Sequence, residues 1–160
     1  MDVTKETRTR YFQALNGLTY QGVQIPIFVG FLDDSASLPT INGGEIYIVI
    51  QDQQAYDSAI QPYCTYNVTS DITIRVVSKF TKKGTTSIVE DIAMEVDDRI
   101  RGTIKRRDEN VIEVGRVRLS VNRLLVENSD THTAYSKILI YQNDLYLKKK
   151  KKNKYNGRKN

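Results

Sequence analysis

The chain has very few of the residues that carry out most protein chemistry: its 160 residues include one histidine, one cysteine and no tryptophan. General acid–base catalysis, nucleophilic catalysis and the binding of zinc or copper draw mostly on His or Cys, usually in spatial clusters. His132 and Cys64 alone cannot form such a cluster. Ten tyrosines, many β-branched residues and charge are present instead. The sequence therefore favours a structural or interaction protein over an enzyme.

Long hydrophobic runs are also missing. No run of about 18 apolar residues occurs, and the first fifteen residues are mostly polar or charged, so the sequence indicates neither a transmembrane span nor a signal peptide. One cysteine cannot form an internal disulfide, which fits a reducing cytoplasm. We expect a chain that is made in the cytoplasm and makes no contact with a membrane.

The net charge of +5 comes from one end of the chain. Residues 148–160 hold no acidic residue and eight basic ones, namely Lys148, Lys149, Lys150, Lys151, Lys152, Lys154, Arg158 and Lys159. Without these eight, 16 of the 24 basic residues remain against 19 acidic residues, a charge of −3 for residues 1–147. We predict one domain over residues 1–147, followed by a basic tail that is disordered when free.

Helix and strand patterns alternate along residues 1–147. Thr4 as a cap and Gly17 as a stop predict a first helix to Asn16, and Ser87 with Glu90 has the pattern of a capping box that opens a second helix to about Gly102. Alternating apolar residues predict strands over Val23–Phe31, Glu45–Gln53, Tyr66–Phe80, Val111–Val126 and His132–Tyr141. The order α-β-β-β-α-β-β predicts an α+β fold, with an antiparallel sheet and both helices packed on one of its faces.

Three adjacent acidic pairs are the residues that a metal-dependent nuclease would use: Asp33 and Asp34, Glu90 and Asp91, and Asp97 and Asp98. Carboxylate oxygens suit Mg²⁺. Neighbouring residues of a helix or strand point in different directions, so each pair offers one ligand at a given site. We therefore interpret the pairs as charged surface, and expect no metal and no cofactor. A nuclease that uses Asp33 or Asp71 stays open as an alternative.

The basic tail carries the one nucleic-acid signal in the chain. Each Lys or Arg that meets a phosphate releases a counterion and adds affinity that does not depend on base sequence. A solubilising terminus explains the same residues equally well. Neither Gly43-Gly44 nor Lys83-Gly84-Thr85 has the spacing of a phosphate-binding loop. A small nucleic-acid-binding protein that uses this tail is therefore the main alternative to a structural protein.

Over about residues 3–104, the chain resembles the tail terminator, or tail completion, family of tailed bacteriophages in the order and the residues of several segments. The matching segments are Ala14–Gly17 at the end of the first helix, the strand Gln24–Phe28, the loop residues Leu38-Pro39, the strands Glu45–Ile50 and Thr69–Val76, and the helix Ser87–Ile100. Two departures stand out, because Ile41–Gly44 lengthens the loop before the second strand and the lysine tail extends past the domain.

The resemblance implies a non-enzymatic virion protein. Members of this family form an oligomeric ring in the head-to-tail connector around the DNA channel, with six subunits in long-tailed phages, and the same fold serves in neck rings matched to a twelvefold portal. The implied partners are other copies of the chain, the portal or adaptor ring, tail proteins and genomic DNA. The implied location is the neck or tail of the virion, after synthesis in the cytoplasm of the host bacterium.

The subunit interfaces are expected on the longest polar connections, residues 33–44, 54–63 and 105–115, because binding sites concentrate on such loops. The candidate interface residues are Asp33, Asp34, Leu38, Asn42, Gln54, Tyr56, Tyr63, Arg106 and Arg107. The eight basic residues of the tail would contact DNA or an acidic neighbouring subunit.

Deletion of residues 148–160 is predicted to leave ring assembly unchanged, because the segments that resemble the tail terminator family all precede the tail. Native mass spectrometry of the shortened chain measures this. If neither the full chain nor the shortened chain forms a ring, and the deletion abolishes DNA binding, the result would instead support the nucleic-acid-binding alternative.

Overall fold

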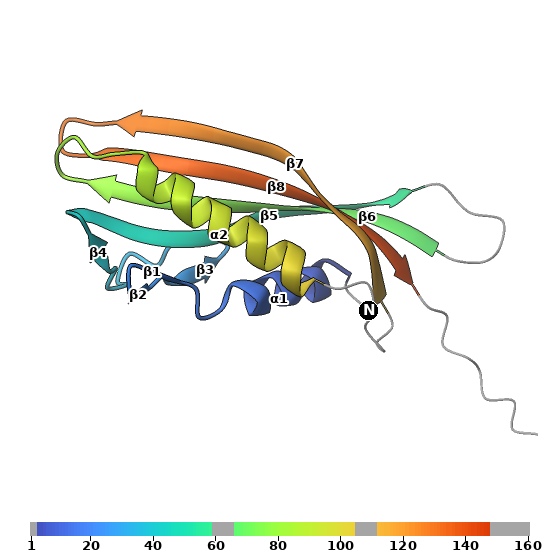
Figure 1. Cartoon of the computed structure of the whole chain (residues 1–160). Coiled ribbons are helices and arrows are strands. Elements are labelled where there is room, and N and C mark those ends of the chain that lie inside the picture. The colour runs from blue at the N-terminus through green and yellow to red at the C-terminus, as the bar shows by residue number, and fades with distance from the viewer. Residues whose placement is uncertain (1–2, 59–65, 105–111, 148–160) are drawn as a thin grey trace, which may run out of the picture.

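The computed structural model of the chain describes residues 3–58, 66–104 and 112–147, and within them two helices lie against a large sheet (Figure 1). The elements are α1 (Val3–Leu15), β1 (Thr19–Tyr20), β2 (Val23–Gln24), β3 (Ile27–Val29), β4 (Thr40–Ile41), β5 (Gly44–Ser58), β6 (Tyr66–Phe80), α2 (Ser87–Thr103), β7 (Ile112–Asn128) and β8 (Thr133–Leu147). The prediction of an α+β fold is confirmed.

The main sheet has the strand order β3-β5-β6-β8-β7, and the short strand β4 also pairs with the beginning of β5. The four long strands pair antiparallel with one another, as expected. β3 is parallel to β5, with Phe28 opposite Val49, and this pairing was not expected. β1 and β2 form a separate two-stranded hairpin.

The strand predicted over Val23–Phe31 is broken into two pieces. Pro26 has no N–H to donate to a ladder, and its carbonyl accepts a hydrogen bond from the Ile48 N–H at 2.9 Å. The predicted alternation of buried residues is wrong at the end of this segment, where Val29 is 44% exposed and Phe31 79% exposed. Gly30, at φ +88°, turns the chain away from the sheet between them.

The two helices have nearly the predicted bounds, although α2 does not begin with the expected capping box. Ser87 is the first residue of α2, and the residue before it, Thr86, has helical dihedral angles and makes no side-chain cap. The Thr85 hydroxyl accepts a hydrogen bond from the Ser87 N–H at 3.2 Å, and the Thr86 hydroxyl donates to the Glu90 carboxylate at 3.3 Å. The stabilising hydroxyls therefore lie one and two residues earlier than the sequence pattern indicated.

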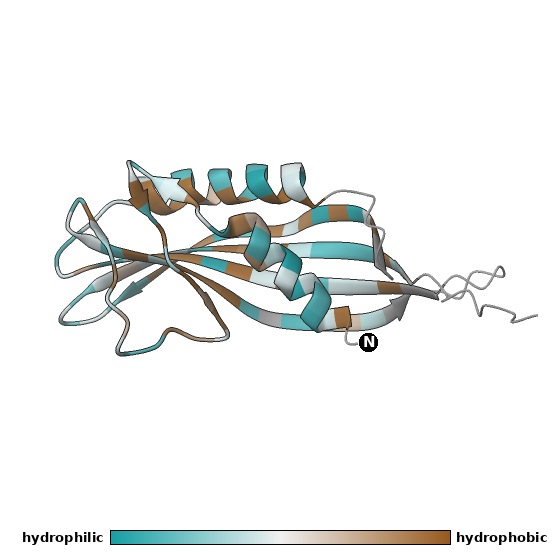
Figure 2. Ribbon diagram, turned by 90° about the horizontal axis from the view of Figure 1, so that it is seen from below, coloured by the Kyte–Doolittle hydropathy of each residue, from teal (hydrophilic) through white to brown (hydrophobic). Residues whose placement is uncertain are grey.

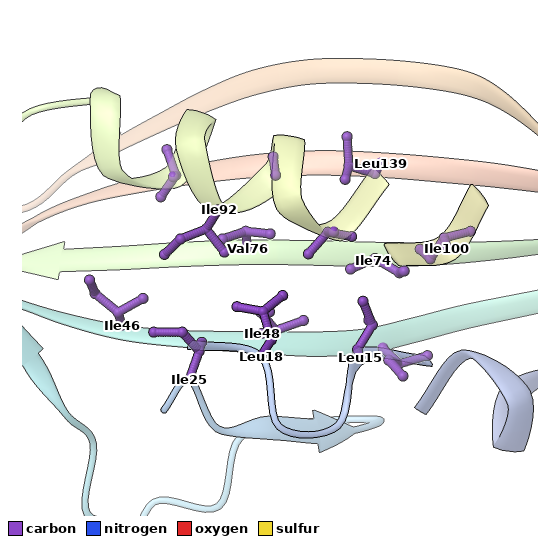
Figure 3. Packing of buried hydrophobic residues seen from close by; sticks show 14 of the residues in the cluster. Leu15, Leu18, Ile25, Ile46, Ile48, Ile74, Val76, Ile92, Ile100 and Leu139 are labelled. Atoms are coloured by element: carbon purple, nitrogen blue, oxygen red, sulfur yellow. The ribbon is translucent and has the colours of Figure 1, made fainter. Parts of the chain in front are cut away.

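Both helices cover the same face of the sheet. Apolar side chains of β5, β6 and β8 pack against those of α1, α2 and the segment that follows α1 (Figure 3). The labelled members of this core are Leu15, Leu18, Ile25, Ile46, Ile48, Ile74, Val76, Ile92, Ile100 and Leu139. Each is at most 1% exposed, and burial of one such side chain contributes about 1.5–3 kcal/mol. No helix among the described residues is long and apolar enough to cross a membrane.

The hydropathy of the helices differs between the side that faces the sheet and the side that faces away from it. Figure 2 shows hydrophilic residues on the outward turns of the helices and hydrophobic residues where helices and strands meet. A second, smaller cluster of Val68, Val114 and Leu145 continues the core towards the far end of the sheet, where Val3 and Ile104 pack against it. The helix ends thus anchor the part of the sheet that extends beyond the main core.

Two tyrosine hydroxyls are held by polar partners at the boundary of the core. The Tyr11 hydroxyl donates to Asn143 Oδ1 at 2.7 Å, and Asn143 Nδ2 donates to the Ser70 carbonyl at 3.0 Å. The Tyr141 hydroxyl donates to Asp97 Oδ1 at 2.9 Å. Burial is the main cause that raises the pKa of both tyrosines well above the ordinary value, so both remain neutral donors.

Replacement of Tyr11 by phenylalanine is predicted to lower the free energy of unfolding by about 1–3 kcal/mol, because Asn143 Oδ1 is buried and loses its donor. Tyr20→Phe is the matched control, since it removes an exposed hydrogen bond to Asp91 and should change stability by less than about 0.5 kcal/mol. Urea unfolding followed by circular dichroism measures both values. Equal effects of the two substitutions would contradict the prediction.

Candidate subunit interface

The described residues contain no group of three or more His, Cys, Asp and Glu that could hold a metal ion. His132 lies in the turn between β7 and β8, where its Nδ1 is 2.9 Å from the Ser129 hydroxyl and 3.0 Å from the Thr131 hydroxyl. These contacts give the histidine a structural role in the turn, as the sequence indicated. Cys64 lies outside the described residues.

The acidic residues proposed for the nuclease alternative are spread over separate elements. Asp33 lies in the loop after β3 and Asp71 in the middle of β6. On α2, Asp97 accepts hydrogen bonds from Tyr141 and Arg101, and Asp91 accepts one from Tyr20. The described carboxylates therefore belong mostly to local hydrogen bonds and ion pairs on the surface.

The helices are too short to cover the sheet. α2 has 17 residues and is about 25 Å long at 1.5 Å per residue, whereas the 17 residues of β7 span about 55 Å at 3.3 Å per residue. Two helices side by side, each about 10 Å wide, cover about four strands at a spacing of 4.8 Å, and this sheet is five strands wide. Part of the sheet must therefore remain uncovered.

The uncovered part of the sheet is the second half of β7, at one edge; in the first half, Val114 belongs to the smaller core cluster, and Val117 and Leu119 pack against the main core. Every residue from Asn122 to Asn128 is exposed, and within this stretch Leu124 is 38%, Leu125 37% and Val126 45% exposed. We call Arg123, Leu124, Leu125 and Val126 the β7 edge patch. An edge strand of this length leaves a row of backbone N–H and C=O groups free to pair with another chain, and three consecutive exposed apolar residues favour such contact.

The opposite edge of the sheet carries the loop between β3 and β4, residues 30–39. The carboxylate of Asp33 accepts hydrogen bonds from the Ser35 N–H at 3.0 Å and the Ser35 hydroxyl at 2.7 Å, and the Ala36 N–H donates to the Asp33 carbonyl at 2.9 Å. The bonds from Ser35 lower the pKa of Asp33, which keeps it ionised. The loop is therefore locally ordered and acidic, with the exposed Phe31 beside Asp33 and Asp34.

The other candidate residues near this edge occupy different environments. Leu38 is half-buried in the same loop, whereas Asn42, at φ +51°, and Gly43, at φ +84°, form the turn between β4 and β5. Asp33, Asp34, Leu38 and Asn42 thus lie at one edge of the sheet, although the extra residues before β5 make a tight hairpin turn and no open loop.

The second expected interface segment differs from its prediction. Gln54 was expected to begin a polar loop or arm, yet β5 continues to Ser58, beyond an irregularity in register between Ile50 and Gln53. Tyr56 is 46% exposed on this extension, and its hydroxyl accepts a hydrogen bond from Gln142 Nε2 at 2.9 Å. Here the polar residues belong to a strand, because its partner β6 is equally long.

The third expected segment is only partly described. Residues 112–115 of the expected segment 105–115 belong to β7. The candidate residues Tyr63, Arg106, Arg107, Lys148, Lys149, Lys150, Lys151, Lys152, Lys154, Arg158 and Lys159 lie outside the described residues.

The face of the sheet that carries no helix has charged side chains along β7 and its neighbours. Arg75 pairs with Glu127 at 2.9 Å, and Arg118 is 3.6 Å from Asp144. Arg116 and Arg123 are exposed, and neither has an ion-pair partner among residues 3–58, 66–104 and 112–147. Exposed pairs of this kind contribute little to stability, about 0–1 kcal/mol each, so the charges are available to a partner at small cost.

Sequence reasoning missed the exposed apolar residues at both edges. Val29 and Phe31 were predicted to belong to a strand with alternating buried residues, and the β7 edge patch was not identified. One signal was present: Leu124-Leu125-Val126 is a run of consecutive apolar residues, so at least one of them must face away from the core of a strand. Nothing comparable marked Phe31, because its exposure depends on the turn at Gly30.

Replacement of Leu124 and Val126 together by lysine is predicted to change the free energy of unfolding of the isolated chain by less than about 0.5 kcal/mol per residue, because neither side chain belongs to the core. Leu139→Ala is the contrasting control on β8, where a side chain only 1% exposed is lost, at a cost of about 2–5 kcal/mol. Thermal and urea unfolding measure both. A large loss of stability in the lysine variant would show that the β7 edge patch supports the fold.

No family model matches the chain, and no curated protein matches it in sequence. Among solved structures, it is similar to a chain in the virion of a native gene transfer agent (GTA) particle, with a TM-score of 0.59 and 11% sequence identity. The match covers 91% of this chain and 99% of that chain. The two chains therefore share a fold over nearly their whole lengths.

Proposed function

We propose that this chain is a structural protein of a phage-like virion, without enzymatic activity, and that it forms a ring in the head-to-tail connector, in the manner of a tail terminator or neck protein. The fold that it shares with a chain of a gene transfer agent virion is the observation that carries this proposal. The resemblance of residues 3–104 to the tail terminator family points to the same class of protein. The scarcity of His and Cys supports a role in assembly.

The two edges of the sheet support a ring geometrically. A ring requires a head-to-tail contact, in which two different surfaces of one subunit meet the complementary surfaces of its two neighbours. The β7 edge patch and the loop between β3 and β4 lie at opposite edges of the same sheet, as Figure 1 shows. A contact between them can repeat around an axis and close at six or twelve subunits.

The charge distribution supports a location around DNA. Residues 1–147 carry a charge of −3, so the bulk of a ring would not hold phosphates tightly while DNA passes. The eight basic residues of the tail would bind DNA or an acidic neighbour, such as the portal, an adaptor ring or a tail protein. The second candidate function, a small nucleic-acid-binding protein, rests on this basic tail alone.

The ring is predicted to appear in native mass spectrometry of the full chain, alone or after mixing with portal and neck proteins of the same virion. Negative-stain images of the large species should show a closed six- or twelvefold ring. A chain that stays monomeric with these components, yet binds DNA with a steep dependence on salt, would contradict the connector function and favour the second candidate.

A further inference from the structure

The two exposed edges are complementary in chemistry as well as in position. Within the β7 edge patch, Leu124 and Val126 lie on the side of the strand that faces the helices, whereas Arg123 and Leu125 lie on the other side, as do Arg116 and Arg118 further along the strand. Glu127, next to the patch, is paired with Arg75. The edge is therefore apolar on the side of the helices and basic on the other side.

The loop between β3 and β4 has the opposite character. Phe31 projects into solvent with 79% of its surface exposed, and Asp33 and Asp34 follow directly. Residues 30–39 contain no basic residue. The hydrogen bonds of Ser35 and Ala36 to Asp33 hold residues 33–36 in a turn, so this part of the loop loses less conformational freedom on binding.

We propose that this loop of one subunit docks on the β7 edge patch of a second copy of the chain. Phe31 packs on Leu124 and Val126, on the side of β7 that faces the helices, and Asp34 reaches round the edge of the strand to Arg123 of that second copy, which points to the other side. An aromatic anchor that becomes fully buried at the centre of a contact typically carries much of its binding energy. The charges at the rim set the register and exclude the reverse orientation.

A second copy fits this patch better than a different partner does. The contact joins opposite edges of one sheet, so each subunit still has one free loop and one free patch after pairing, and assembly continues until a ring closes. A twofold dimer would instead place patch against patch and bring the arginines of two β7 strands together. The inference rests on the proposed ring and names the contact that closes it.

Complementation between two variants tests the contact. The loop variant Phe31→Ser keeps an intact patch, and the edge variant Leu124→Lys/Val126→Lys keeps an intact loop. Each alone is expected to be monomeric, with association at least about tenfold weaker than in the unchanged chain. An equimolar mixture has one intact contact, so it should give a heterodimer of two 18.3 kDa chains and no ring in native mass spectrometry.

The charges are tested separately, by reversal. Arg123→Glu is expected to weaken association, and Asp34→Lys in the same chain is expected to restore it. Phe12→Ser is the matched control, since Phe12 is an exposed aromatic residue on α1, outside both surfaces, and its loss should leave the ring unchanged.

The outcomes separate this contact from the proposed function. Rings that persist in both the loop variant and the edge variant would overturn the contact and leave the connector function standing. Homodimers of either variant would overturn the head-to-tail arrangement. An unchanged chain that forms no oligomer, even with portal and neck proteins, would overturn both proposals. Circular dichroism of each variant confirms that it is folded.

Discussion

The mismatch in length between helices and strands determines most of this structure. Four strands of 15 to 17 residues are joined edge to edge, but the helices available to cover them have only 13 and 17 residues. Because a helix advances less than half as far per residue as a strand, the apolar cover ends well before the sheet does. The core forms between the helices and the sheet. Side chains on the part of the sheet that the helices do not cover must be polar, or must be covered by a partner.

A protein built in this way is suited to assembly. Its described residues contain no group of His, Cys, Asp and Glu that could hold a metal ion, whereas its sheet ends at two edges of different chemistry. A chain of a gene transfer agent virion has the same fold, although only 11% of the residues are identical. The fold can therefore be maintained by the pattern of buried and exposed positions with few particular side chains in common.

The elements with strong local signals were predicted well. α1, β6 and α2 have nearly the bounds that Gly17, the alternation over Tyr66–Phe80 and the apolar stripe of Ile88, Ile92 and Ile100 indicated. The parallel pairing of β3 and the continuation of β5 through polar residues were not predictable, because each depends on a strand distant in sequence. The exposure of Phe31 depends on the turn at Gly30, which the alternation of apolar residues does not indicate. Asp33 and Asp34 were predicted to begin a loop and lie in one, but the apolar residues beside them became apparent only from the structure.

The order of strands also has a consequence for synthesis. β8, the last strand of the chain, lies between β6 and β7 and pairs with both along its full length. β6 and β7 do not pair with each other, so a nascent chain holds two unsatisfied strand edges until residue 147 has left the ribosome. Such edges are sites of misassociation, and long-range pairings form slowly. The sheet thus becomes complete only when β8 has left the ribosome, and until then no chain presents a finished β7 edge to another copy.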